Sequence, residues 1–255
     1  MKKIFALLLS LLLLAGCGRT QGSRPNTPQQ PDASSAPGET IDCRISCRME
    51  DSLLLLPQEG GELITLSPRN LVLEDQQGQA MQPDALRPGM CVQIDFDGSV
   101  LETYPCQLSG ATALRVTGEF QNLVPFYLDR LDELYQEDEA LNSDIEKVAL
   151  DLSELGNISE EEKEALRYLV ECRWGKEAFF SSYQELCDQG EIDRDRPYYE
   201  KGIILSLACK EETQDGFAVS GEKWRSGLGA IGYHDAKVQW KDGEWTFEKG
   251  AWFIS

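Results

Sequence analysis

The chain has 255 residues, with 44 acidic and 24 basic side chains and a formal net charge of -20 at neutral pH. Neutralising phosphates requires a basic face, so this charge argues against nucleic acid and anionic lipid as partners. The length is enough for one large domain or two modest ones.

The first seventeen residues have the pattern of a bacterial lipoprotein signal peptide. Lys2 and Lys3 precede an apolar run, Ile4 to Leu14, that is too short for a stable membrane span. The following Ala15-Gly16-Cys17 resembles a lipobox, which implies a diacylglyceryl group on the Cys17 thiol. An ordinary signal peptide with an incidental cysteine is the alternative. The lipobox predicts a protein anchored to the cell membrane on its extracytoplasmic face, because two acyl chains hold a protein at a bilayer.

Residues 18–40 are rich in Gly, Pro, Ser, Gln and Asn and almost lack apolar side chains between Gly18 and Pro37. Such a segment cannot build a core, and the composition predicts a disordered linker.

Residues 41–117 consist of short apolar runs separated by Gly, Pro and Asp, a pattern typical of strands and turns. Asp97-Gly98 lies between two alternating runs and predicts a two-residue hairpin. Five or six short strands in this space predict a small all-β module, an OB-like barrel, with a small sandwich as the alternative. The expected strands are 41–49, 52–56, 63–66, 71–73, 91–96 and 100–104.

Residues 118–255 are expected to form an α+β domain with its helices packed on a curved antiparallel sheet. Apolar residues at helical spacing between Phe120 and Tyr135 predict a helix that begins near Pro125. Ser159 with Glu162, and Ser182 with Glu185, are capping boxes that predict two further helices, the first reaching Trp174. The expected strands are 145–152, 203–209, 217–220, 236–240 and 245–253, the last two joined at Asp242-Gly243.

Several short segments resemble those of uncharacterised Gram-positive (Clostridia-type) bacterial lipoproteins that pair a small β-module with an α+β module. They are Leu86-Arg87-Pro88-Gly89, Phe96-Asp97-Gly98, Glu102-Thr103-Tyr104-Pro105, Lys223 to Gly229 and Trp240 to Trp245. The resemblance covers most of residues 40–255 and implies the two-module architecture, but no activity.

Gly227 to Gly232 matches the letters G-x-G-x-x-G, yet a strand rather than a helix is expected after it, which argues against a dinucleotide cofactor. A turn between strands is the simplest interpretation. Exposed loops often carry binding, and an arginine there can meet a carboxylate. A possible ligand rim is therefore formed by Trp224, Arg225, Gly227, Gly229 and His234.

His234 is the only histidine, and its neighbour Asp235 should point to the opposite face of a strand, so a catalytic triad is not expected.

Seven cysteines besides Cys17 have no C-x-x-C spacing, which argues against zinc. Cys91 with Cys106 is the one disulfide considered, and the remaining thiols are expected in the core. Acidic runs lack the spacing of a calcium loop, so the sequence predicts no metal and no cofactor.

Seven aromatic residues gather near the C-terminus and have two interpretations: cross-strand pairs that stabilise the sheet, or the wall of a pocket for an apolar, aromatic or glycan ligand. They are Trp224, Tyr233, Trp240, Trp245, Phe247, Trp252 and Phe253.

The sequence as a whole predicts a non-catalytic binding or protein-interaction component of the cell envelope. The alternative is an envelope enzyme or small-ligand-binding protein that uses a pocket in the α+β domain.

Overall fold

The computed structural model describes residues 38–213 and 215–255. The predicted signal peptide, Cys17 and most of the predicted linker lie outside the described residues. Strand β1 begins at Glu39, so the last two residues of the range predicted as linker, Glu39 and Thr40, belong to a strand. No helix in the described ranges is both long enough and apolar enough to cross a membrane.

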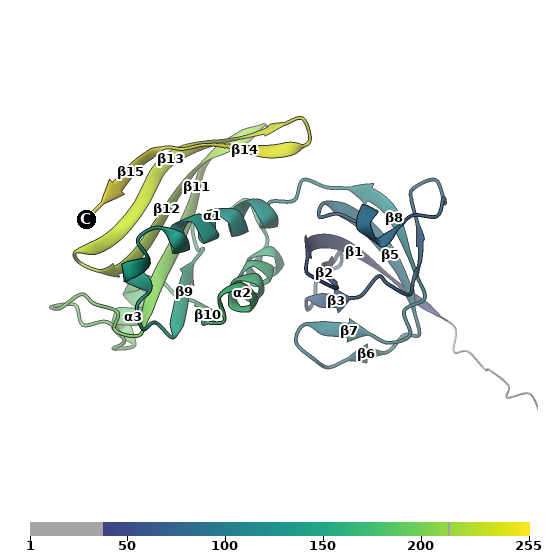
Figure 1. The fold of residues 1–255 in the computed structure, drawn as a ribbon, viewed down its shortest axis with the longest axis horizontal. Helices are drawn as coiled ribbons and strands as arrows, with labels where there is room; N and C mark the ends of the chain where they lie inside the picture. Colours follow the sequence, from purple (N-terminus) through teal and green to yellow (C-terminus); the bar gives the residue numbers. More distant parts are fainter. Residues whose placement is uncertain (1–37, 214) are drawn as a thin grey trace, which may run out of the picture. The chain divides into compact units, whose positions relative to one another are not determined.

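Eight strands of the first half form one mixed sheet in the order β4-β8-β5-β1-β2-β3-β7-β6 (Figure 1). Among the described strands no pairing joins the two end strands, so the sheet is open and the predicted OB-like barrel is not confirmed. The strands are β1 (Glu39–Arg48), β2 (Leu53–Pro57), β3 (Ile64–Leu66), β4 (Val72–Glu74), β5 (Met90–Phe96), β6 (Val100–Leu101), β7 (Cys106–Leu108) and β8 (Ala113–Glu119).

The hairpin predicted across Asp97-Gly98 is wrong. Strand β5 lies between β1 and β8, and β6 pairs with β7 instead. The Asp97 carboxylate accepts hydrogen bonds from the Ser99 amide at 2.9 Å and the Ser109 hydroxyl at 2.9 Å. These bonds tie the turn to the segment after β7, so the turn exists without the expected strand pairing.

The first sheet buries one face, as the alternation of apolar and polar residues along its strands predicts. Along β5 every second residue is buried, from Met90 to Phe96. These side chains pack with Cys43 and Ile45 of β1 and with Leu114 and Val116 of β8 in a core of their own.

The second half contains a seven-stranded sheet in the order β10-β9-β11-β12-β13-β14, with β15 also paired to β13. Its long antiparallel strands follow one another in sequence, as expected. The sheet is nevertheless mixed, because β9 runs parallel to β10 and β11, and β10 was not predicted. The strands are β9 (Lys147–Asp151), β10 (Glu177–Phe180), β11 (Gly202–Thr213), β12 (Gly216–Ser226), β13 (Gly229–Lys241), β14 (Glu244–Glu248) and β15 (Ala251–Ile254).

The three α-helices begin where the sequence predicts. Helix α1 (Val124–Gln136) has Pro125 in its first turn, where a missing amide is harmless. Helix α2 (Glu160–Trp174) and helix α3 (Tyr183–Asp188) both begin with the predicted capping boxes, in which serine and glutamate side chains satisfy free amides. With two mixed sheets and few helices, the fold is α+β and mostly β.

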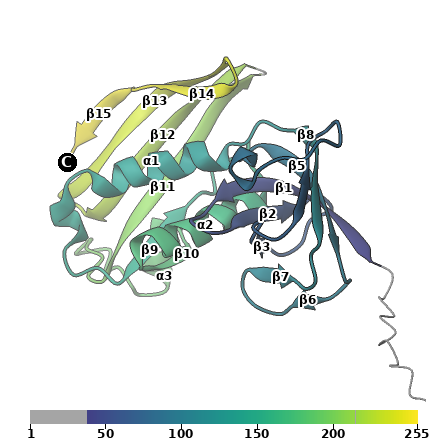
Figure 2. The same ribbon diagram turned by 45° about the vertical axis from the view of Figure 1, so that its right-hand side comes forward.

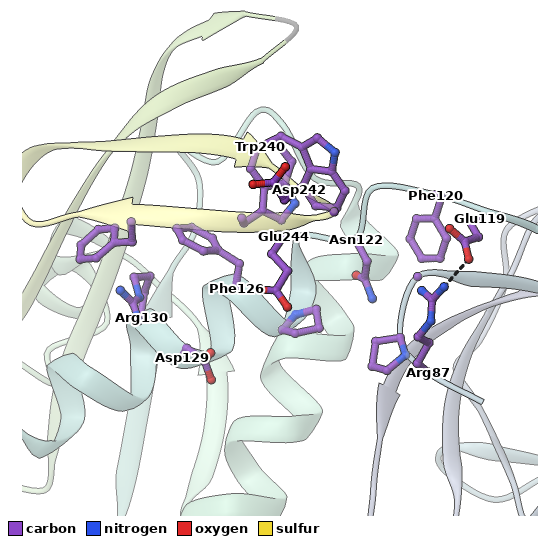
Figure 3. A pocket seen from close by; sticks show the side chains of 16 residues that line it. Arg87, Glu119, Phe120, Asn122, Phe126, Asp129, Arg130, Trp240, Asp242 and Glu244 are labelled. Atoms are coloured by element: carbon purple, nitrogen blue, oxygen red, sulfur yellow. Dashed lines mark hydrogen bonds and ion pairs between the residues drawn. The ribbon is translucent and has the colours of Figure 1, made fainter. Parts of the chain in front are cut away.

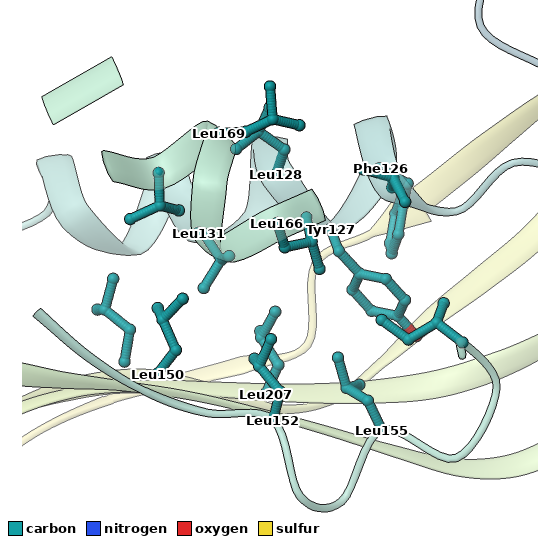
Figure 4. Packing of buried hydrophobic residues seen from close by; sticks show 14 of the residues in the cluster. Phe126, Tyr127, Leu128, Leu131, Leu150, Leu152, Leu155, Leu166, Leu169 and Leu207 are labelled. Atoms are coloured by element: carbon teal, nitrogen blue, oxygen red, sulfur yellow. The ribbon is translucent and has the colours of Figure 1, made fainter. Parts of the chain in front are cut away.

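Helices α1 and α2 cover one face of the second sheet, and α3 lies on the other. Tyr127, Leu128 and Leu131 of α1 pack with inward residues of β9, β11 and β12 (Figure 4). Leu186 of α3 packs with Ala149 and Ile204, which alternate to the opposite face. The open part of that second face, beside α3, is therefore available to solvent.

The core under α1 and α2 also includes side chains from the first sheet. Leu54, Leu56 and Leu63 belong to the same buried cluster as Leu131 and Leu166. Arg167 of α2 reaches back to donate a hydrogen bond to the Tyr104 hydroxyl at 3.1 Å. The predicted boundary near residue 118 coincides with the end of β8, and the apolar core continues across it.

Three tyrosines in these cores are expected to resist ionisation until the protein unfolds. Burial raises the pKa of Tyr199 to about 12 and raises those of Tyr127 and Tyr233 further. Above about pH 10, the unfolded chain loses protons that the folded chain keeps, so the free energy of unfolding should fall by about 1.4 kcal/mol per pH unit for each such tyrosine. Absorbance of tyrosinate during alkaline titration, compared with far-ultraviolet circular dichroism, measures this. Ionisation of all eight tyrosines near pH 10 without unfolding would contradict it.

Candidate functional site

A cleft of about 680 Å³ opens beside the first turns of α1, and we call it the aromatic cleft (Figure 3). One wall is α1, a second is the hairpin that joins β13 to β14, and a third comes from Arg87 to Gly89 and the end of β8. Aromatic rings are prominent in the wall: Phe120, Phe126, Trp240, Trp245 and Phe247.

The hairpin that carries the two tryptophans forms as the sequence predicts. Asp242 and Gly243 both have positive φ, 52° and 87°, as a two-residue hairpin turn requires. Trp240 and Trp245 are cross-strand partners with ring centroids 5.0 Å apart. The structure thus confirms the cross-strand interpretation for this pair, and the same two side chains also line the cleft.

Charged side chains in the cleft wall are largely paired. Arg87 forms an ion pair with Glu119. Arg130 stacks over Phe247, 4.2 Å from the ring centroid, and its Nη1 lies 3.3 Å from Glu133 Oε2. Asp129, Asp242 and Glu244 are exposed at the rim. The cleft therefore combines ring surfaces with solvated acceptors at its edge.

Asn122 is buried and lines the cleft beside the start of α1. Its Nδ2 donates hydrogen bonds to the carbonyl oxygens of Ile45 at 3.3 Å and Ser46 at 2.8 Å. Its Oδ1 accepts a hydrogen bond from the Val124 amide at 3.1 Å, one of the free amides at the start of α1. One side chain thus joins the start of α1 to β1.

The structure does not bring the predicted ligand rim together, because Arg225 points into the protein. Its guanidinium donates to the carbonyl oxygens of Leu141 at 2.8 Å, Ser143 at 2.7 Å and Glu200 at 3.2 Å. Lys223, two residues earlier on the same face, is fully buried. Arg225 is therefore a structural residue, and the prediction that it meets a ligand carboxylate is wrong.

The other predicted rim residues are divided between the outer face of the sheet and the β12–β13 turn. Trp224 and Gly227 line a hollow beside α3, and His234 lines a second hollow nearby. The His234 ring stacks on Phe253 at 4.7 Å, and no hydrogen bond from this ring is found in the described residues. Gly229 lines neither hollow and faces Ser226 and Leu141.

The residues that match G-x-G-x-x-G lie in a turn and in the strand that follows it. Gly227 and Leu228 connect β12 to β13, as the turn interpretation predicts, and β13 begins at Gly229. A Cβ on Gly232 would lie 2.2 Å from the Gly221 carbonyl oxygen. Close approach of two strands, rather than of a phosphate, therefore explains this glycine.

All seven cysteines of the described region are free thiols. The disulfide considered between Cys91 and Cys106 is wrong, because β5 and β7 are not neighbours. Cys43 and Cys47 face different cores, since a bulge after Ile45 shifts the register of β1. Burial raises the pKa of Cys43 to about 12, so its thiol stays protonated.

The sequence singled out Trp240, Trp245 and Phe247 of the aromatic cleft but missed most of its other residues. Arg87 lies far upstream of α1, Glu119 lies a few residues before it, and Arg130 lies within it, so no local spacing links them. Their one sequence signal is the Arg87-Pro88-Gly89 turn. Within the described ranges, no three His, Cys, Asp or Glu side chains are grouped so as to hold a metal ion.

Comparison with known proteins gives no relative. No family model, no curated protein and no solved structure matches this chain.

Proposed function

We propose that this protein is a lipid-anchored lipoprotein of the extracytoplasmic membrane face that binds a ligand of the cell envelope in the aromatic cleft. The aromatic cleft carries the proposal, because five ring side chains from separate segments line one hollow of about 680 Å³. The lipobox at Cys17 and the resemblance to Gram-positive lipoproteins support the location.

A glycan is the ligand class that best suits the cleft. Sugar rings present flat C–H faces that pack on aromatic side chains, and hydroxyl edges that donate to carboxylates. Trp240 and Trp245 offer the faces, and Asp242 and Glu244 offer exposed acceptors on the same hairpin.

The charged side chains in the wall of the cleft favour ligand binding over catalysis. Its two arginines are engaged, Arg87 with Glu119 and Arg130 with Glu133 and the Phe247 ring. Electrostatic catalysis needs donors aimed at charge that develops on a substrate, whereas each of these guanidinium groups already faces a carboxylate of the protein.

Replacing Trp240 by alanine is expected to weaken glycan binding by about 10-fold or more, since aromatic residues often dominate binding energy. Trp240 is half-buried on the hairpin, so the fold should survive. Titration of the full-length protein with N-acetylglucosamine oligomers in a calorimeter measures the effect. Trp240→Phe should retain part of the affinity.

The matched control is Trp174→Phe, because Trp174 stacks on Tyr135 at 4.1 Å and does not line the cleft. This variant should bind as the wild type does. Equal affinities of the wild type and Trp240→Ala, or no binding by the wild type, would contradict a glycan site in the cleft.

The anchor has a separate test. Cells fed an alkyne-tagged fatty acid should label the wild-type chain, and Cys17→Ser should lose the label completely, because the acyl group is expected on that thiol. Cys172→Ser is the control, as Cys172 is an exposed thiol elsewhere in the chain. Label on Cys17→Ser, or an unlabelled wild type, would contradict lipidation at Cys17.

A further inference from the structure

A polar row crosses the outer face of the second sheet. Strand register aligns Asp151 of β9 with Ser206 of β11, Ser206 with Glu222 of β12, and Glu222 with Gly232 of β13. Gly232 is paired in turn with Phe253 of β15. These strands lie side by side in the sheet (Figure 2). The row belongs to the face that α3 covers only in part.

Two hollows meet at this row, and we call them together the outer trough. A hollow of about 440 Å³ is lined by Tyr183 and Trp224, and a second of about 220 Å³ by Ser220 and His234. Both are also lined by Asp151, Ser206 and Glu222. The outer trough shares no lining residue with the aromatic cleft.

Glu222 is half-buried at the junction of the two hollows. Within the described ranges its carboxylate has neither a hydrogen-bond donor nor an ion-pair partner. Lys210 and Lys237 lie in another row, with Ala218, about 13 Å along β12 from Glu222 at ordinary strand rise. Burial raises the pKa of Glu222, and the nearby His234 offsets part of this rise.

Trp224 stands next to Glu222 on the same face of β12. The two residues are two positions apart, which places their Cα atoms about 7 Å from each other. Tyr183 of α3 holds the Trp224 ring edge-on, with centroids 4.9 Å apart. The space between this ring and the carboxylate suits an ammonium group, which is attracted to both an anion and the face of an indole.

We propose that the outer trough binds a small organic cation, with its ammonium group between the Glu222 carboxylate and the Trp224 ring. Charge complementarity identifies the occupant: Asp151 and Glu222 face the hollows as carboxylates, and no lysine or arginine lines either hollow. Ser206, between the two acids, offers a hydroxyl to a polar part of the ligand.

The probes are choline and its uncharged isostere 3,3-dimethylbutan-1-ol, titrated into the full-length protein. One cation contact to an indole and one to a carboxylate predict a dissociation constant for choline on the order of 1 mM or tighter. The isostere should bind about 10-fold more weakly or not at all. Equal binding of both probes, or no choline binding at about 10 mM, would overturn the proposal.

Three substitutions locate the site. Glu222→Gln and Trp224→Leu should each weaken choline binding by about 10-fold, and Trp224→Phe should retain part of it. Glu222→Gln should also raise the melting temperature, because it removes a half-buried charge without a partner. If Glu222→Gln is more stable than the wild type yet does not bind choline, Glu222 contributes to ligand binding and not to folding.

Glu248→Gln is the control, since Glu248 is exposed on β14 and lines neither hollow. It should bind choline as the wild type does. Unchanged choline affinity in Glu222→Gln would overturn the proposal. The aromatic cleft is tested separately, because Trp240→Ala should leave choline binding intact.

Discussion

Replacing Lys223 by methionine is expected to lower the free energy of unfolding by about 3 kcal/mol, since charge-assisted hydrogen bonds are among the strongest in proteins. Lys223 is fully buried, and its Nζ donates to the carbonyl oxygens of Tyr135 at 2.8 Å, Glu137 at 2.6 Å and Asp138 at 3.2 Å. These carbonyls lie at or just beyond the end of α1, where no intrahelical amide reaches them. Methionine fills the space but leaves the carbonyls without this donor.

The pH dependence of this loss has a definite sign. Burial lowers the pKa of Lys223 to about 8, although the charges of Asp138, Glu137 and Glu139 act in the opposite direction. Between about pH 8 and the ordinary lysine value near 10.4, the unfolded chain holds a proton that the folded chain has released. The contribution of Lys223 to stability therefore rises with pH across this window. The gap between wild type and Lys223→Met should widen there.

Urea unfolding of both proteins at several pH values measures this gap. The matched control is Lys210→Met, because Lys210 is an exposed lysine on the neighbouring strand β11. It should change the free energy of unfolding by less than about 0.5 kcal/mol. A Lys223→Met variant as stable as Lys210→Met would contradict the predicted contribution of these three hydrogen bonds.

Replacing Gly232 by alanine is expected to cost about 3 kcal/mol, the upper end of ordinary overpacking. The new Cβ would lie 2.2 Å from the Gly221 carbonyl oxygen and 2.9 Å from Glu222 Cα. Both atoms are backbone, so no rotamer change relieves the clash, and β12 and β13 must separate. Thermal unfolding of the variant measures the cost.

Gly156→Ala is the matched control for this substitution. No atom lies within 4 Å of a Cβ built there, and its φ is outside the left-handed region. Its stability should equal or slightly exceed that of the wild type, because alanine restricts the unfolded chain. Comparable losses in both variants would indicate a general intolerance of side chains and would contradict the clash at Gly232.

Features with a local cause could be predicted from the sequence. The capping boxes at Ser159 and Ser182 depend on residues three positions apart, and both helices begin there. Asp242-Gly243 encodes its own positive φ values, and the hairpin forms. The spacing of apolar residues likewise predicted the buried faces of β5 and α1, because this spacing is also a local feature of the sequence.

Features that depend on distant partners were missed. Asp97-Gly98 provides a turn, but β1 and β8 occupy both edges of β5, so the expected hairpin has no room. The face to which Arg225 points follows from the register of β12 with its neighbours, which includes bulges that composition does not reveal. The aromatic cleft combines segments more than a hundred residues apart, so only Trp240, Trp245 and Phe247 could be singled out.

One apolar cluster contains Leu54 and Leu56 of β2 together with Leu131 of α1. The chain therefore cannot be divided near the end of β8 without opening this cluster. A polypeptide cut near residue 118 would expose leucines on both fragments that the intact chain hides from water. We therefore expect the two halves to fold cooperatively, so that a substitution in one half also changes the stability of the other.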